Sequence, residues 1–174
     1  MYEGEKLERG IETVLQNNIA AALVAVAARW EDIADVTLPS VASWTCGYRS
    51  WILDLASSNF PYIVTIVNGQ NPVGRVEFGA QDVIAQSSIS IFITAATEAN
   101  ANTIIHRYIE AVIDILQANQ VIEGHKLRHY EPKRRIIADS TKHLVNAPKG
   151  DYEKASDVDY MRLGVIEPEY ELLS

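Results

Sequence analysis

The hydrophobic positions divide the chain into segments with a helical period and segments with a strand period. Apolar side chains recur every three or four residues over residues 7–33, which predicts a long amphipathic helix. The same spacing, preceded by Thr97 as N-cap, predicts a second helix that ends near Asn119. Between the helices, residues 62–67 and 88–94 alternate and are rich in β-branched side chains, so each predicts a strand.

Other segments have weaker patterns. Residues 41–58 place several apolar side chains on one helical stripe, and a short helix is the prediction. Asn68-Gly69 predicts a turn at the end of the first strand, followed by a polar loop to Gly74 and a short strand at residues 75–78.

In the C-terminal third, residues 126–130 alternate weakly, and short strands are expected at residues 134–139 and 142–146. A closing strand fits residues 160–166 and resumes beyond Pro168. The prediction is one α+β domain over residues 1–174, with a mainly antiparallel sheet packed with two main helices. The order is helix, three strands, helix and closing strand or strands, and residues 41–58 and 121–156 are read as insertions or extended connectors.

Composition narrows the class of protein. About half of the 174 residues are hydrophobic (48%), which excludes a disordered chain, and the net charge of -8 argues against general binding of phosphate backbones. Cys46 is the only cysteine, so an internal disulfide is impossible. The longest apolar run, residues 19–28, is about ten residues long, whereas a membrane span needs roughly twenty. We therefore expect a soluble protein with no membrane partner.

Motifs for catalysis are weak. The glycines at 69, 74 and 79 fit turns better than a phosphate loop, and Cys46 lacks the local signature of a nucleophile. His125 and His129 would share one face of a helix and could bind a metal there. The segment reads as extended, however, which separates them by about 13 Å. We predict no enzyme activity, no cofactor and no metal, with a small metal-dependent enzyme as the alternative.

The charges of the C-terminal third are uneven. Residues 123–143 contain six basic and three acidic side chains, whereas residues 150–174 contain seven acidic and two basic ones. These two runs suggest either a solvated surface or head-to-tail attraction between neighbouring copies. Trp44, Tyr48 and Trp51 are interpreted as core packing or, alternatively, as anchors for a partner in a non-viral binding module.

The order of elements resembles the tail terminator, or tail completion, proteins of long-tailed bacteriophages. The resemblance covers about residues 7–119 and rests on the strands PYIVTIV (61–67) and SISIFITA (88–95) and on the following helix with HRYIEAV (106–112). It implies an α/β sandwich that forms a homohexameric ring in the virion, at the head-proximal end of the tail. The protein would be made in the host cytoplasm and would not be an enzyme.

In this family the ring caps the tail tube and meets the head-tail connector or stopper, while DNA passes transiently through the lumen. The expected partners are therefore further copies of the chain, a tail tube protein and a connector or stopper protein. A stopper or a tail tube subunit is the alternative role within the same machine. From exposure and charge, the expected interface residues are Asn68, Gly69, Gln70, Asn71, Gly74, Lys133, Arg134, Arg135, Glu167, Glu169, Glu171, Trp44 and Trp51.

Overall fold

The computed structural model describes residues 3–30, 37–47, 60–73, 82–144 and 158–172. Two helices and a mixed sheet of eight strands make an α+β fold, as predicted. The elements are α1 (Glu3–Arg29), β1 (Ser43–Cys46), β2 (Tyr62–Val73), β3 (Asp82–Ala95), α2 (Glu98–Ala118), β4 (Val121–Ile122), β5 (His125–Leu127), β6 (Lys133–Leu144), β7 (Val158–Glu167) and β8 (Glu169–Leu172).

The sheet is organised around the long strand β3. One edge of β3 pairs with β2, and β2 pairs in parallel with β1, while all the other pairings are antiparallel. The second edge of β3 is shared by β7 and β8, which pair with its two halves. Pro168 separates these two strands, and its carbonyl accepts hydrogen bonds from the backbone N–H and the hydroxyl of Ser87. Strand β6 lies beyond β7, and β5 and β4 lie beyond β8.

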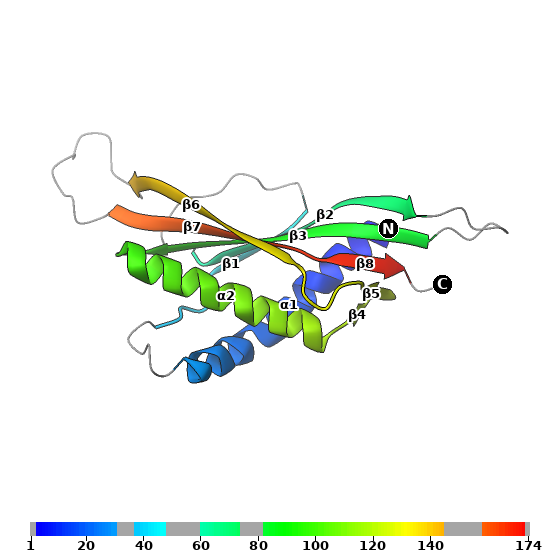
Figure 1. The fold of residues 1–174 in the computed structure, drawn as a ribbon, viewed down its shortest axis with the longest axis horizontal. Helices are drawn as coiled ribbons and strands as arrows, with labels where there is room; N and C mark the ends of the chain where they lie inside the picture. The colour runs from blue at the N-terminus through cyan, green and yellow to red at the C-terminus, as the bar shows by residue number, and fades with distance from the viewer. Residues whose placement is uncertain (1–2, 31–36, 48–59, 74–81, 145–157, 173–174) are drawn as a thin grey trace.

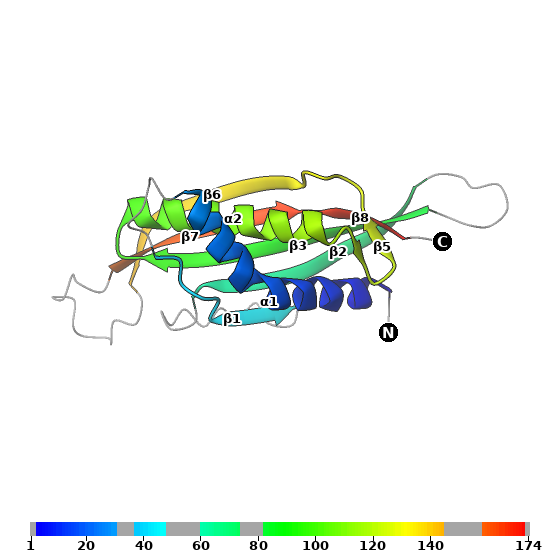
Figure 2. The same cartoon turned by 90° about the horizontal axis from the view of Figure 1, so that it is seen from below.

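Both helices lie on the same face of the sheet (Figure 1), and the view from below shows them crossing in front of the strands (Figure 2). Their apolar stripes form the core with the inward-facing side chains of β2, β3 and β7. The fully buried members of this core include Leu7, Ile11, Leu15, Ile63, Ile89, Ile91, Ile93, Ile105, Tyr108, Leu116 and Ile166. The predicted amphipathic helices are therefore confirmed, and burial of this stripe is what holds them to the sheet.

Helix α2 begins and ends where the sequence predicts. The hydroxyl oxygen of Thr97 accepts a hydrogen bond from the backbone N–H of Asn100 at 3.2 Å, and Asn119 is the C-cap. Near the N-terminal end of α2, the buried guanidinium of Arg162 on β7 donates to Asn102 and Glu98, each at 2.6 Å. These contacts join the helix to the sheet.

Among the described helices, α1 is long and apolar enough by length and composition to cross a membrane. The apolar run of residues 19–28 underestimates the length of the apolar part of α1, because the helix has only a few charged side chains along its central part. A core helix passes the same test; Leu7, Ile11 and Leu15 are fully buried here, while 28% of the apolar stretch as a whole is buried within the protein.

The predicted short helix over residues 41–58 is wrong where the structure describes it. Residues Ser43–Cys46 form β1 and pair in register with Tyr62 to Thr65. Gly47 then adopts a positive φ of 85° and donates its N–H to the carbonyl of Thr65 at 3.0 Å. The sheet edge offered by β2 determines the conformation here, whereas the helical stripe depended on Tyr48, Trp51 and later residues, which lie outside the described residues.

The predicted turn at Asn68-Gly69 is also wrong. Strand β2 continues to Val73, paired with β3, and the register shifts between Val67 and Gly69, so Asn68 marks a bulge inside the strand. The polar loop predicted from Gly69 is strand as far as Val73, while Gly74, Gly79 and the strand expected at 75–78 lie outside the described residues.

The C-terminal strands differ from the prediction mainly in β6 and in the short strands β4 and β5. The two short strands expected at residues 134–139 and 142–146 belong to one strand, β6, with an irregular register between Ala138 and Lys142. The closing strand is confirmed as β7, and its continuation past Pro168 is confirmed as β8. Residues 121–144, interpreted as part of a connector, supply β4, β5 and β6 to the sheet.

Candidate interaction surfaces

The expected interface residues of β2 lie in the second half of the strand, within the β2–β3 ladder. Asn68 and Gly69 are exposed at the bulge, and nothing lies within 4 Å of the position that a Cβ would take on Gly69. Gln70 and Asn71 follow, with their backbones paired to Ala85 and Ile84. The structure therefore places this segment in a paired strand in place of a loop.

The basic and acidic runs of the C-terminal third meet within the chain. Arg135 on β6 lies 3.4 Å from the carboxylate of Glu167 on β7, because the two strands are neighbours. Arg128 likewise lies 3.3 Å from Glu169. The complementarity seen in the sequence is thus partly used inside one subunit. Exposed pairs of this kind contribute little to stability.

Two of the three lysines of the basic run follow the same geometry. Lys133 is opposite Glu167 in the β6–β7 register, and Lys126 is opposite Glu171 in the β5–β8 register, whereas Lys142 is opposite Tyr160. Lys133 and Lys126 therefore each face an acidic residue across a strand pair, a favourable arrangement on a sheet surface. Strand pairing within one subunit therefore accounts for part of the charge pattern.

The tryptophans singled out by the sequence have different positions. Trp44 on β1 is half-buried and packs against the core, and Trp51 lies outside the described residues. Trp30, which the helical stripe assigned to the core, is 43% exposed at the end of α1. Its indole N–H donates to the carboxylate of Glu110 on α2 at 2.9 Å.

The histidines proposed as metal ligands do not converge. His125 is buried on β5, and its Nδ1 lies 2.9 Å from the backbone carbonyl oxygen of Glu123. His129 is exposed, with Nε2 3.6 Å from Glu169. Within the described ranges, no group of three or more histidine, cysteine or acidic side chains is arranged to bind a metal.

Cys46 is half-buried beside the acidic face of α1. Burial raises the pKa of its thiol to about 12, and the nearby carboxylates of Glu8 and Glu12 act in the same direction. Burial also raises the pKa of Glu8, although the carboxylate accepts a hydrogen bond from the backbone N–H of Val67 at 3.1 Å. A thiol held protonated in this way is a poor nucleophile at neutral pH.

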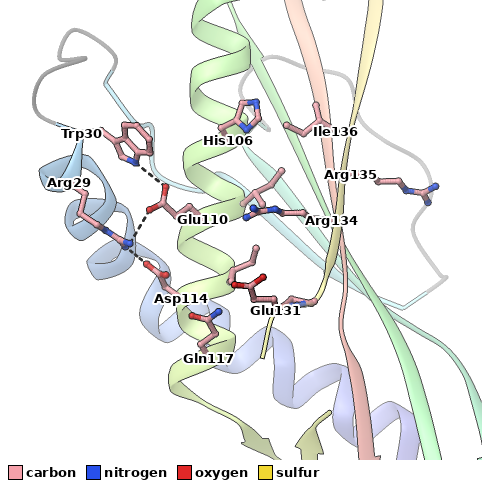
Figure 3. A pocket seen from close by; sticks show the side chains of 13 residues that line it. Arg29, Trp30, His106, Glu110, Asp114, Gln117, Glu131, Arg134, Arg135 and Ile136 are labelled. Atoms are coloured by element: carbon pink, nitrogen blue, oxygen red, sulfur yellow. Dashed lines mark hydrogen bonds and ion pairs between the residues drawn. The ribbon is translucent and has the colours of Figure 1, made fainter. Parts of the chain in front are cut away.

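A groove of about 740 Å³ lies between α2 and the edge strand β6, which we call the α2–β6 groove (Figure 3). One wall consists of side chains on a single face of α2, and the other of side chains at the start of β6. The end of α1 closes one side. The lining residues are Arg29, Trp30, His106, Ile109, Glu110, Ile113, Asp114, Gln117, Glu131, Pro132, Arg134, Arg135 and Ile136.

The charges around this groove are only partly neutralised. Arg29 lies 2.9 Å from Glu110 and also pairs with Asp114, so these two carboxylates of α2 already have a cationic partner. Figure 3 shows Arg134 and Ile136 turned toward α2, whereas Arg135 points away from it. In the described part of the chain, no hydrogen bond or ion pair engages Arg134.

The sequence analysis did not predict that the residues lining this groove lie together. His106, Glu110 and Asp114 recur at intervals of four and thus share a helix face, which is a signal that the sequence does contain. What the sequence does not show is that the strand carrying Arg134 runs beside that face. That neighbourhood depends on the long-range pairing of β6 with β7.

The architecture is an α+β fold with both helices on one face of a mixed sheet. A chain in the virion of a native gene transfer agent particle has a similar fold, with 15% sequence identity and a TM-score of 0.50. The similarity covers 97% of this chain and 96% of that chain. No protein-family profile and no curated protein matches the sequence. At this level of sequence identity, the similarity shows that the two chains share a fold.

Proposed function

We propose that this protein is a structural component of a phage-like virion. The observation that carries the proposal is the likeness in fold, over nearly the whole of both chains, to a chain of a gene transfer agent virion. Proteins of the same fold often differ in function. The separation of His125 and His129 in the structure gives the alternative of a metal-dependent enzyme at these residues no support.

Within the virion, we propose the role of tail terminator, a homohexameric ring that caps the tail tube and contacts the head-tail connector or stopper. The order of helix, strands, helix and closing strands supports this role, because the family resemblance rests on that order. The exposed bulge at Asn68 and Gly69 supports a place for this segment in the proposed interface. The net charge of -8 would keep DNA from adhering as it passes through the lumen.

Electron microscopy and native mass spectrometry of the full chain, alone and mixed with purified tail tubes, test the role. We expect hexameric rings, and rings at one end of each tube. Monomers that ignore the tubes would contradict the terminator role.

Copy number per virion separates the alternatives within the same machine. A terminator or a stopper is present as a single ring, whereas a tube subunit is present as many stacked rings. Labelling the protein in purified particles then shows whether it lies on the tail tube, as a terminator would, or on the connector, as a stopper would. Absence of the protein from purified virions would overturn the structural role itself.

A further inference from the structure

Strand β6 has one free edge. It pairs with β7 from Lys133 opposite Glu167 to Ala138 opposite Arg162, and no described strand pairs with its other side. An unpaired edge carries backbone N–H and C=O groups that can accept a further strand. The register becomes irregular after Ala138, so the regular part of this edge is the segment from Lys133 to Ala138.

The α2–β6 groove runs along this edge on one face of the sheet. Helix α2 packs on β3 and β7, so it leaves the inner face of β6 open toward the groove. Arg134 and Ile136 point into it, since alternate residues of a strand share a face (Figure 3). Side chains on one face of an added strand would lie beside these two residues and cover the open side of the groove.

The charge beside the edge favours an acidic occupant. Arg29 neutralises Glu110 and Asp114, and Glu167 pairs with Arg135 on the opposite face. Glu131 also lines the groove, but it precedes the strand. Arg134 is a cation of this edge that lines the groove, and no described residue forms a hydrogen bond or ion pair with it.

We propose that the free edge of β6 and the α2–β6 groove form a docking site for an extended segment of a different protein. The segment adds as a strand along Lys133–Ala138, with a carboxylate beside Arg134 and an apolar side chain beside Ile136. Backbone hydrogen bonds supply affinity in this mode of recognition, and the groove supplies selectivity.

A second copy of this chain fits the site poorly. Its open edges among the described strands include β1, the outer half of β2 (residues 66–73) and the terminal strand β4, and its own β6 would offer the regular segment Lys133–Ala138. None of these segments contains Asp or Glu. A second copy therefore cannot present the carboxylate that Arg134 requires from any of these edges, and the site lies apart from the segment Asn68–Asn71 of the proposed ring contact.

Two probe peptides test the proposal on the full chain. The first is acetyl-Thr-Val-Thr-Glu-Thr-Val-Thr-amide. In an extended strand its glutamate and two valines lie on the same face. The sequence is the same read from either end, so this face is presented whether the peptide pairs parallel or antiparallel. The second has Lys in place of Glu. Fluorescence anisotropy gives the affinities, and hydrogen exchange with mass spectrometry locates the binding. We expect slower exchange at Lys133–Ala138 and tighter binding of the Glu probe by about tenfold, as for one charge-assisted hydrogen bond.

The variants Arg134→Glu and Arg135→Glu give a matched comparison, because they make the same change on opposite faces of one strand. Arg134→Glu should reverse the preference in favour of the Lys probe, and Arg135→Glu should leave it within about twofold. Equal affinities of the two probes for the unaltered chain, protection elsewhere, or equal effects of the two variants would overturn the proposal. Protection of β6 that rises with protein concentration alone would assign the edge to a second copy and would equally overturn it.

Discussion

Replacing Gly164 by Ala should destabilise the protein, because α2 crosses β7 at this glycine. A Cβ at position 164 would lie 2.8 Å from Cδ1 of Ile105 and 2.9 Å from Cδ1 of Ile109, whereas ordinary contacts are 3.4–4 Å. Ile105 and Ile109 are 0% and 3% exposed, so neither can move into solvent. Overpacking of this kind costs about 1–3 kcal/mol.

Loss of glycine flexibility in the unfolded chain offsets part of this cost, by about 0.5–1 kcal/mol. We therefore expect a net loss of about 1–2 kcal/mol in the free energy of unfolding, or about 2–4 °C in Tm for each kcal/mol. Urea unfolding followed by circular dichroism, at one protein concentration, measures it.

Gly69→Ala is the matched control for this experiment. It makes the same change in another strand, where nothing lies within 4 Å of the new Cβ. Only the unfolded-state effect remains there, so stability should be unchanged or slightly higher. If the two variants were equally stable, close packing of α2 on β7 would not be what requires glycine at position 164.

Three further predictions concern polar groups that are buried or half-buried. Arg162→Met should change the free energy of unfolding by less than about 1 kcal/mol, because an apolar side chain of similar size avoids burying a charge. Arg162→Ala should lower the free energy of unfolding by about 2–4 kcal/mol, because it leaves a cavity. Chemical denaturation of the two variants and the unaltered chain measures both effects. Cys46, with its pKa raised from 9.0 to about 12, should react with iodoacetamide at pH 8 roughly a thousandfold more slowly than an ordinary thiol, as mass spectrometry can follow. Glu8 has a raised pKa, so its protonated form is favoured by folding, and its contribution to stability is lost as the pH rises through the folded-state pKa. Glu8→Gln should therefore be more stable than the unaltered chain at pH 7. This advantage should disappear below pH 4.5, which is the ordinary pKa of a glutamate side chain. A gain in stability that is the same at every pH would contradict this reasoning.

Elements whose signals are local could be predicted from the sequence. Helix α2 has its apolar stripe, the Thr97 cap and the Asn119 end within one stretch of chain, and each of these is a short-range property. The break between β7 and β8 is local as well, because Pro168 has no N–H to donate to a ladder. These features need no knowledge of distant partners, and the structure confirms them.

Elements that depend on a distant partner could not be predicted in this way. Asn68-Gly69 is a strong turn signal, but the ladder with β3 continues through it, so a bulge replaces the turn. Ser43–Cys46 has little strand signal of its own and becomes extended because the edge of β2 is available. Pairing across the sheet supplies the backbone hydrogen bonds in both places, and this outweighs local preference.

The basic run shows why interaction sites were harder to predict than the fold. In the sequence, Arg134 and Arg135 are adjacent members of one patch. In β6 the pleat places them on opposite faces, so that Arg135 meets Glu167 while Arg134 enters the α2–β6 groove. A shift of one residue in the register of β6 would exchange these environments. Long-range strand pairing therefore determines which of the two arginines is available to a partner, and charge counting along the chain cannot distinguish them.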